Sequence, residues 1–564
     1  MFSRALCFSL TLLASHLFAA TFYIALTGND TNSGTTTNLA WRTIQKAANT
    51  LAPGDTALVR SGVYSEAVTV NVSGNAGSFV TFQNFPGEQP IVDGATVPVP
   101  SVNGGLFTLL ARSNVTVAGF EIRNYRTNAL HVVPAGIWIG GGAHDISILS
   151  NNIHHIENTN ANADGAYGLV AYGDSTATIS NLVIRANELH HLKTAWSESM
   201  ALDGNVSDFE VSSNRVHDNW NIGILMAGWY GTCPVTNLDR ARHGVCRDNT
   251  VWNCSTASNP NYGSPSCAGI YCDGSTDIIV ERNQSFQNDI GLEFATENKG
   301  KPTDHILARN NLVWSNGMGG IFIGGYDTKR GRTELCTITH NTLFHNDTLG
   351  WGQGEFMMQF DTRSNIFTHN LLIANDTAVN LLVCNTSAIN TNNTLDWNLY
   401  FAPGGASAAQ WKWKNTARTS FATWKSVSTN DANSLFADPQ FINAAGTNFH
   451  LATNSPAVNA GATNFTADAG ETDFDFQPRV SGGRTDLGAD ELGALAPVLG
   501  FAAPANGVVQ LTLTGEPGHT FVWEKSAALT NWQPLATNFA DGGSLLLTSS
   551  VAAPAGFFRA KLVQ

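Results

Sequence analysis

One repeating pattern, between about residues 136 and 375, constrains the fold of this chain more than any other feature. A short strand of the form Gly-apolar-x-apolar is followed by a second short strand and then by Asn-x-apolar-x-x-Asn. The first strands are GIWIG (136–140), GLVAY (168–172), SMALD (199–203), GILMA (223–227), GIYCD (269–273), GLEFA (291–295), GIFIG (320–324) and EFMMQ (355–359). The turn asparagines, spaced 27 to 36 residues apart, are Asn151, Asn187, Asn214, Asn249, Asn283, Asn311, Asn341 and Asn370.

A unit of this length favours three short strands that stack as successive coils. It is too short for a propeller blade and lacks the periodicity of helices. Coils stacked about 4.8 Å apart would pair each strand in parallel with its neighbours and enclose a core that one coil cannot bury alone. The composition agrees, because 53 Gly and only 13% charged residues suit short strands and tight turns. The repeat therefore predicts an all-β chain, a right-handed parallel β-helix (solenoid).

Two rows of side chains recur with the coils, and we predict that both are structural. The amide of each turn asparagine tolerates left-handed turn geometry and can bond to the asparagine of the next coil. Three residues after each turn asparagine, histidines give way to aromatic residues. This favours a continuous stack of rings over a metal site made of the three histidines. The row is His154, His190, His217, Trp252, Phe286, Trp314 and Phe344.

Side-chain alternation divides the first strands into an inner and an outer set. The second and fourth positions, such as Ile270 and Cys272, are predicted to face the core. The third and fifth positions point outward and gather acids and aromatic residues on neighbouring coils: Tyr172, Asp203, Tyr271, Asp273 and Glu293. Chemistry is therefore expected on this one outer face.

The longest loops, 228–244, 296–304 and 325–334, leave the same edge of that face. Clustered insertions on a solenoid often wall a binding site. A groove of aromatic, acidic and basic residues suits a sugar chain, because rings cover its apolar sides while charged groups bond hydroxyls or carboxylates. The predicted substrate-binding residues are Asp203, Trp229, Tyr230, Tyr271, Glu297, Tyr326 and Asp327.

Two reactions fit these residues. In a lyase, Ca²⁺ held by Asp203, Asp273 and Glu293 would neutralise a uronate carboxylate, and a basic side chain would remove the C5 proton. In a hydrolase, Asp273 and Glu293 would act as acid and base, their Cα atoms about 8 Å apart on neighbouring coils. Asp203 and Asp273 each precede a glycine, a pattern that is also common in turns without any chemistry. The predicted catalytic residues are Asp273, Glu293, Lys299, Lys301 and Arg330.

Residues 1–20 have the pattern of a signal peptide. Arg4 precedes a largely apolar run from Ala5 to Phe18, and the small residues Ala19 and Ala20 follow it. This run is too short to span a membrane comfortably, so we expect a secreted protein, extracellular or periplasmic. Seven cysteines remain after the leader, and those in loop-like insertions are disulfide candidates: Cys233, Cys254 and Cys267.

The formal net charge of −14 excludes the basic face that nucleic acid requires. A polyanionic substrate would need a cation or a local basic patch. No stretch after the leader is long and apolar enough for a transmembrane helix, so neither nucleic acid nor a membrane span is expected.

Both ends of the solenoid carry further signals. WRTIQKAANTLAPGD (41–55) predicts one amphipathic helix that caps the open coil, and YIALTGNDTNSGT before it and TALVRSGVYSE after it extend the same region. This region resembles the opening of secreted bacterial β-helix proteins of the pectin-lyase-like fold, a group that includes polysaccharide lyases and glycoside hydrolases. FADPQFINAAGTNFHLATNSPAVNAG and FDFQPRVSGGRTDLGADEL resemble the closing coils of that group. The resemblance covers roughly residues 22–492 and implies the fold but no particular reaction, since the polygalacturonase motifs and a clear pectate lyase signature are missing.

After residue 495 the strand-like segments VVQLTLTG, TFVWEKS, SLLLTSS and GFFRAKL predict a small C-terminal β module that binds carbohydrate, attaches the protein to a surface or caps the solenoid. The predicted organisation is a signal peptide (1–20), a β-helix with an N-terminal cap (21–495) and the module (496–564).

The leading functional prediction is a secreted enzyme that degrades polysaccharides, a lyase acting on uronate-containing glycans by β-elimination. A glycoside hydrolase with a carboxylate pair is the alternative. The third candidate is a non-catalytic carbohydrate-binding or adhesive solenoid, which would have no need to gather acids and bases between clustered loops.

Overall fold

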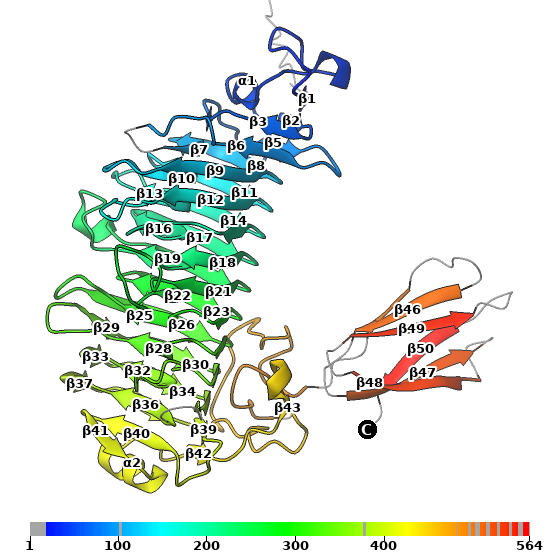
Figure 1. Ribbon diagram of the computed structural model, residues 1–564. Helices are drawn as coiled ribbons and strands as arrows, with labels where there is room; N and C mark the ends of the chain where they lie inside the picture. The colour runs from blue at the N-terminus through cyan, green and yellow to red at the C-terminus, as the bar shows by residue number, and fades with distance from the viewer. Residues whose placement is uncertain are drawn as a thin grey trace, which may run out of the picture.

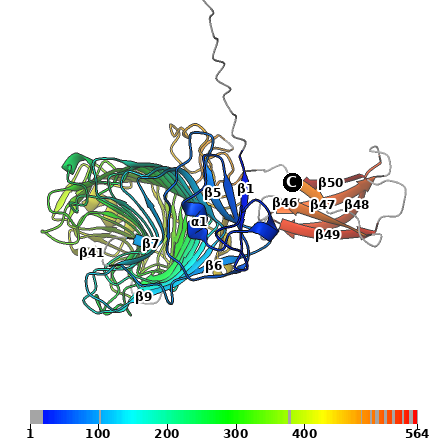
Figure 2. The same cartoon turned by 90° about the horizontal axis from the view of Figure 1, so that it is seen from above.

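The computed structural model describes residues 19–100, 104–375, 380–481, 483–493, 498–501, 508–514, 519–526, 531–540, 544–550 and 557–562. Residues 1–18, which make up most of the predicted signal peptide, lie outside this range, as does the predicted domain boundary at residue 495. The described chain rises through successive coils stacked along one axis, and the strands of successive coils lie over one another when seen from above (Figures 1 and 2). The predicted parallel β-helix is confirmed.

Each complete coil passes through three long sheets in the order sheet I, sheet II, sheet III, and in the later coils the sheet II strand is divided in two, as in β29 and β30. Sheet I contains β4 (Val68–Thr69), β7 (Gly104–Leu110), β10 (Pro134–Gly140), β13 (Tyr167–Gly173), β16 (Met200–Gly204), β19 (Ile224–Ala227), β22 (Ala268–Asp273), β25 (Ile290–Ala295), β28 (Gly319–Ile323), β32 (Phe356–Met358), β36 (Leu381–Asn385), β40 (Gln410–Trp413) and β41 (Thr416–Arg418). Sheet II contains β1 (Thr21–Ile24), β2 (Thr56–Val59), β5 (Val80–Asn84), β8 (Ser113–Ala118), β11 (His144–Leu149), β14 (Ile179–Arg185), β17 (Val206–Ser212), β20 (Arg242–Arg247), β23 (Thr276–Glu281), β26 (Pro302–Arg309), β29 (Arg332–Glu334), β30 (Thr337–Thr339), β33 (Asp361–Arg363), β34 (Ile366–Thr368), β37 (Ile389–Thr391) and β38 (Thr394–Asp396). Sheet III contains β3 (Gly62–Tyr64), β6 (Pro90–Asp93), β9 (Glu121–Thr127), β12 (Asn152–Asn158), β15 (Glu188–His190), β18 (Arg215–Trp220), β21 (Thr250–Ser255), β24 (Gln284–Phe286), β27 (Leu312–Trp314), β31 (Thr342–Phe344), β35 (Leu371–Ile373), β39 (Leu399–Phe401) and β42 (Leu435–Phe436).

The register of sheet I agrees with the predicted alternation of side chains. On β22 and β25, Ile270 pairs with Leu292 and Cys272 with Phe294, and these four side chains lie in the core. The intervening positions point outward, where they form a second apolar cluster that includes Val170, Ala201, Leu225, Tyr271 and Phe322. The outer face of sheet I is therefore itself largely covered.

The asparagine row forms a continuous buried ladder. The side-chain amide of Asn214 donates to Oδ1 of Asn249 at 3.0 Å, and that of Asn249 donates to Oδ1 of Asn283 at 2.9 Å. The predicted bonding is confirmed, but the predicted left-handed geometry of the asparagines is wrong. Positive φ angles fall on the residues before them, such as Ser213 and Asp248. The backbone N–H of each asparagine also donates along the ladder, so the preceding residue makes the bend.

The histidine and aromatic row is a stack of rings from His154 to Trp314, as predicted, whereas Trp314 and Phe344 each contact Phe449. Centroids lie 4.8 Å apart for His154 and His190, 5.2 Å for His190 and His217, and 4.0 Å for His217 and Trp252, each pair with nearly parallel planes. Rings stacked face to face direct their nitrogens sideways rather than toward a shared ion, so the row stabilises the scaffold.

Short helices close both ends of the stack. At the N-terminal end α1 (Ile44–Ala48), preceded by η1 (Thr37–Leu39), buries Ile44, Ala47 and Ala48 against the core. The predicted helix over residues 41–55 is thus much too long, because Thr43 caps it and the chain leaves helical geometry after Asn49. At the other end α2 (Phe421–Ser428) packs Trp424 into the same core.

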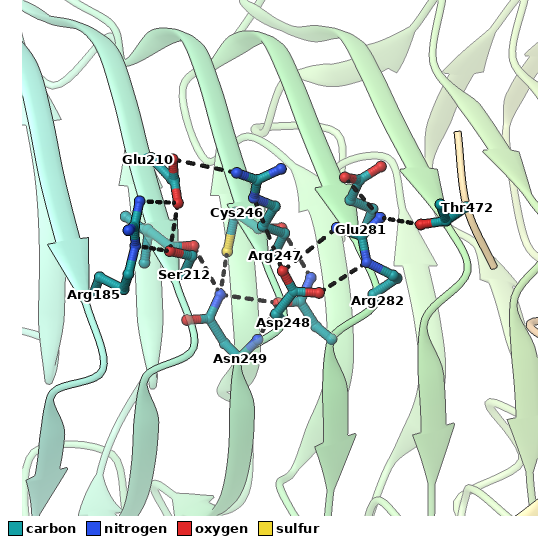
Figure 3. A network of polar contacts seen from close by, with 12 residues as sticks. Arg185, Glu210, Ser212, Cys246, Arg247, Asp248, Asn249, Glu281, Arg282 and Thr472 are labelled. Atoms are coloured by element: carbon teal, nitrogen blue, oxygen red, sulfur yellow. Dashed lines mark hydrogen bonds and ion pairs between the residues drawn. The ribbon is translucent and has the colours of Figure 1, made fainter. Parts of the chain in front are cut away.

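Residues 437–493, here called the closing segment, differ from the coils that their resemblance implied. They contain β43 (Phe441–Asn443), η3 (Ala444–Gly446) and β44 (Asn448–Leu451), and they fold back along the outside of the middle coils (Figure 1). Figure 3 shows one attachment, where Arg282 donates to Oγ1 of Thr472 at 3.2 Å. Arg309 adds ion pairs with Asp468 at 2.7 Å and Glu471 at 3.0 Å. The segment therefore buttresses the solenoid from the side.

The C-terminal module consists of two antiparallel three-stranded sheets. One contains β45 (Val498–Phe501), β46 (Val508–Thr514) and β49 (Ser544–Ser550), and the other contains β47 (His519–Ser526), β48 (Gln533–Ala540) and β50 (Phe557–Leu562). Its core holds Leu511, Phe521 and Trp523. Among the described residues, no helix has the length and apolar character that crossing a membrane requires.

The seven cysteines after the leader are all buried, and all are free thiols. The predicted disulfides of Cys233, Cys254 and Cys267 are therefore wrong. Each of these thiols occupies its own packing site: Cys254 lies in the main core, Cys233 donates to the carbonyl of Ser175, and Cys267 donates to Asp289.

Candidate functional site

A cavity of about 460 Å³ lies on the outer face of sheet I, over β22, β25, β28 and β32. Aromatic, apolar and amide side chains line it together with two carboxyl groups, and none of the described residues around it is Lys, Arg or His. The lining residues are Asn221, Ile222, Tyr262, Ser266, Cys267, Ala268, Tyr271, Ile290, Glu293, Glu297, Met318, Phe322, Tyr326, Gln353, Met357, Gln359 and Thr386.

The floor of the cavity follows directly from the register of the coils. Tyr271 on β22 pairs with Glu293 on β25, and Glu293 pairs with Phe322 on β28. A carboxyl group is thus held between two aromatic residues on successive coils, and Glu293 is only 7% exposed.

Three loops and a strand end build the walls. The loop before β22 supplies Tyr262, and the loop after β28 supplies Tyr326. The loop between β31 and β32 supplies Gln353, and Glu297 follows the end of β25. The cavity is therefore bounded on both edges of sheet I, although sequence reasoning expected walls on one edge only.

Burial dominates the protonation of Glu293. It raises the pKa of this carboxyl well above its usual range, and the neighbouring charges of Glu297 and Asp273 raise it further. Because water does not solvate the ionised form, burial favours the protonated form of Glu293.

Glu297 stands in a different environment at the rim. Burial raises its pKa, but the guanidinium of Arg330 opposes this shift. Nη2 of Arg330 lies 3.9 Å from Oε2 of Glu297, and the same guanidinium stacks on the ring of Tyr326 and donates to its hydroxyl. Of the two lining carboxyls, Glu297 is the one with a cation beside it.

Asp273 lies just outside the cavity and supports Glu297. The backbone N–H of Glu297 donates to Oδ1 of Asp273 at 3.1 Å, and the hydroxyl of Tyr230 donates to Oδ2. Burial raises the pKa of Asp273 to about 7, and the charge of Glu297 adds to the shift. Asp273 therefore accepts hydrogen bonds from both the 228–244 loop and the 296–304 loop.

Two more acids extend the cluster toward earlier coils. Burial raises the pKa of Asp203 to about 6, although Thr232 donates to its Oδ2 at 3.0 Å. Burial also raises the pKa of Glu198 well above its usual range, with Asp203, Asp273 and Glu297 contributing as like charges. The outer face of sheet I therefore carries five carboxyl groups that resist ionisation together.

The structure brings the three predicted loops into contact, but it does not gather all the predicted residues. Trp229 donates to the carbonyl of Pro302, and its ring lies between the charged groups of Arg240 and Lys301. Trp229, Arg240 and Lys301 lie outside the lining of the cavity. Lys299 and Asp327 also lie outside it: Lys299 is exposed, and the carboxylate of Asp327 accepts the backbone N–H of Lys329. Arg330 is the predicted base that approaches the lining most directly, through Glu297 and Tyr326.

Calcium stays a prediction for this face. Among the described residues, one group of three or more potential ligands has its donor atoms all within 4.8 Å of one another, and it lies elsewhere, at His450, Asp475 and Asp490. The carboxylates of Asp203, Asp273 and Glu293 are more widely spread than that, so a cation there would need bridging waters or side-chain movement.

Sequence reasoning missed Glu198, Tyr262, Gln353 and Gln359 as lining or neighbouring residues. A signal for Tyr262 was present, since the spacing of 34 residues between Asn249 and Asn283 reveals an insertion in that coil. Glu198 lies one residue before the SMALD pattern (199–203) and so fell outside the aligned strands.

The cavity thus combines a carboxyl group whose protonated form is favoured by burial with one whose ionised form is favoured by a nearby cation. Such a pair can donate a proton to one atom of a bound molecule and withdraw one from another. The aromatic walls and amide groups suit a ligand with apolar faces and many hydroxyls.

Comparison with known proteins gives the chain its relatives. Residues 22–191 match a family model described as "Pel9A-like, right handed beta helix region", and residues 107–331 match one described as "Right handed beta helix region". The uncharacterized protein YwoF of Bacillus subtilis (strain 168) is 34% identical over 436 residues, which are 77% of this chain and 91% of YwoF. Pectate lyase L of Paenibacillus polymyxa (strain SC2) is 24% identical over 321 residues, which cover 54% of this chain and 64% of that protein.

Two solved structures are similar to the chain at low sequence identity. The GH136 lacto-N-biosidase from Eubacterium ramulus superposes with a TM-score of 0.45 and 14% identity, covering 74% of this chain and 67% of that one. Pectate lyase Pel9A gives a TM-score of 0.42 and 13% identity, covering 84% and 96%.

Proposed function

Since the chain belongs to the family of YwoF, among the right-handed parallel β-helix proteins of the pectin-lyase-like group, we propose that it is an enzyme that cleaves polysaccharides. The observation that carries this proposal is an aromatic-walled cavity lined by two carboxyl groups in different surroundings: Glu293 is buried, and Glu297 faces Arg330.

We assign the reaction to glycoside hydrolysis. Glu293 donates its proton to the glycosidic oxygen as its bond to the anomeric carbon breaks. Glu297 either takes a proton from the water that attacks this carbon, or attacks the carbon itself to form a glycosyl-enzyme that water then hydrolyses. Asp273 orients Glu297 through its backbone N–H, and Tyr230 holds Asp273 in turn. Tyr262 and Tyr326 offer faces on which sugar rings can pack.

Neutral sugars are the substrate class that this charge distribution favours. The described lining residues include carboxyl groups and no basic side chain, and Asp203, with a pKa of about 6, adds negative charge to the same face at neutral pH. A uronate chain would meet repulsion there unless a cation came with it.

Uronate β-elimination is the second candidate, because the Pel9A-like family match and the relation to pectate lyase L favour it. It would require Ca²⁺ among Asp203, Asp273 and Glu293, and a base from Arg330, Lys301 or Lys299. Secretion, and surface attachment through the C-terminal module, are part of the same proposal, since a polysaccharide is met outside the cell.

The test is a panel of neutral polysaccharides and uronate polymers incubated with the mature chain, with and without a chelator. New reducing ends without ultraviolet-absorbing unsaturated sugars support hydrolysis. Chelator-sensitive formation of unsaturated ends would replace it by elimination. Binding of a polymer without any cleavage would leave the adhesive solenoid as the function.

A further inference from the structure

The closing segment brings together three side chains that can ligate a metal ion. His450 lies on β44, Asp475 lies in the turn that follows Asp473, and Asp490 lies near the end of the segment. One donor atom of each residue lies within 4.8 Å of the donor atoms of the other two.

Asp490 leaves a carboxylate oxygen without a partner. The residue is only 7% exposed, its Oδ2 accepts the backbone N–H of Leu451 at 2.8 Å, and its Oδ1 has no hydrogen bond within the described chain. A buried carboxyl oxygen without a hydrogen-bond partner carries a free-energy cost, because burial removes its hydration and no other contact replaces it. A cation beside Oδ1 would remove this cost.

His450 is held in the orientation that a metal ligand needs. Its Nδ1 lies 2.5 Å from Oδ1 of Asn448, which also accepts the backbone N–H of His450 at 3.2 Å and is thereby identified as the amide oxygen. Nδ1 therefore carries a hydrogen, and Nε2 faces Oδ2 of Asp475 at 2.6 Å. A second hydrogen bond of this kind commonly fixes the tautomer and direction of a ligating imidazole.

The turns that carry the two carboxylates are fixed by Asp473. Its Oδ1 accepts the backbone N–H groups of Asp475 at 2.9 Å and Gln477 at 2.7 Å, and its Oδ2 accepts that of Glu491 at 3.0 Å. Asp473 thus positions the turns that carry Asp475 and Asp490, while His450 and Asp475 also contact each other directly through Nε2 and Oδ2.

We propose that His450, Asp475 and Asp490 bind one divalent transition-metal ion of the Zn²⁺ class. One imidazole nitrogen with two carboxylates suits Zn²⁺ or Mn²⁺, whereas Ca²⁺ takes oxygen ligands throughout. The ion joins β44 to the two turns and so fastens the closing segment into one unit on the side of the solenoid. This site is remote in sequence from the cavity and does not depend on the proposed reaction.

The experiment uses the full mature chain without a histidine tag, stripped with a chelator and then titrated with Zn²⁺, Mn²⁺ or Ca²⁺. Metal content after dialysis is measured by mass spectrometry, and Tm is measured by calorimetry. We expect one equivalent of Zn²⁺ per chain and a rise in Tm on its addition. D490N and D475N should each bind Zn²⁺ at least about tenfold more weakly and lose the Tm rise.

H131Q is the matched control. His131 forms an exposed pair with Asp164 at 3.0 Å, outside the closing segment, so its loss should leave both readouts unchanged. D475N keeps the test valid if D490N does not fold, because Asp475 lies at the partly exposed rim of the group. Wild-type protein that retains no Zn²⁺ or Mn²⁺ would overturn the proposal, as would D475N binding with wild-type affinity or selective binding of Ca²⁺.

Discussion

Nη2 of Arg330 and Oε2 of Glu297 face each other at 3.9 Å on the rim of the cavity, so the cluster of five carboxyl groups has a cation at one edge. This position distinguishes Glu297 from Glu293, which lies deeper and further from the guanidinium. The two acids therefore have different electrostatic surroundings, and the first two predictions test that difference.

Replacing the cation should move the pH profile of the reaction. Arg330 lowers the pKa of Glu297, so R330Q raises it, and the base then becomes ionised only at higher pH. Because the pair is partly exposed, the interaction is worth roughly 0.2–1 kcal/mol, less than about one pKa unit. We expect the acidic limb of kcat/KM against pH to shift upward by less than about one unit. K329Q changes an exposed charge of the same loop and should leave the limb in place; an unmoved limb in R330Q would argue against Glu297 as the base.

Removing the proton donor should depress turnover strongly. E293Q keeps the shape of the side chain but supplies no acidic proton, so kcat on a natural polysaccharide should fall by about 10²–10⁴-fold. An aryl glycoside with a good leaving group needs little protonation, so its cleavage should fall much less. E334Q, which alters a carboxylate paired with Arg332 at 2.7 Å on sheet II, is the control. Equal losses on both substrates would exclude the acid role.

Stability should decrease as pH rises through the acidic range. Burial raises the pKa of Asp203 to about 6 and of Asp273 to about 7, from an ordinary value of 3.8. The folded chain then binds more protons than the unfolded chain between about pH 4 and pH 7, so the contribution of these groups is complete below that window and is lost across it. D273N should flatten the decline of Tm with pH. D277N removes an exposed acid on β23 and should leave the decline of Tm unchanged. A wild-type Tm that rises from pH 4 to pH 7 would contradict the predicted direction of the pH dependence.

The asparagine ladder should tolerate substitution poorly. N249A removes the amide that donates to Oδ1 of Asn283 and to the carbonyl of Val211. It also leaves the backbone N–H of Asn214, which donates to Oδ1 of Asn249 at 3.0 Å, without a partner. Each buried polar group left without a partner costs about 1–3 kcal/mol, so a loss of several kcal/mol is expected in denaturant unfolding. Asn128 lies exposed in a loop, and N128A should change the unfolding free energy by less than about 0.5 kcal/mol. Similar values for the two variants would mean that the ladder adds little.

The coils could be predicted in detail because one short rule repeats. Alternation along GIYCD and GLEFA fixes which side chains face the core, and it correctly paired Tyr271 with Glu293. The asparagine spacing set the register between coils, so the outer face and its acids followed before any coordinates. Because the pattern repeats, each coil independently supported the same assignment of inner and outer side chains.

The walls of the cavity could not be predicted in the same way. Loop length shows where an insertion occurs but not which way it folds, so the 228–244 loop was expected to offer Trp229 to a ligand, whereas Arg240 and Lys301 enclose that ring. Tyr262 enters from the opposite edge of sheet I. The direction of the closing segment depends on single contacts such as Arg309 with Asp468, which have no periodic signature.

The closing segment contacts four successive coils at equivalent turn positions. Arg282 and Asn310 both bond to Thr472, His340 bonds to Thr485, and His369 bonds to Ala462. A solenoid can ordinarily gain or lose a coil with little penalty, because each coil recognises only its neighbours. Here the closing segment, which does not repeat, makes a different contact with each of a fixed number of coils. Inserting or deleting one coil between Arg282 and His369 would shift every later coil away from its contact in the closing segment. This part of the molecule is therefore constrained to one length, while the coils nearer the N-terminus remain free to vary in number.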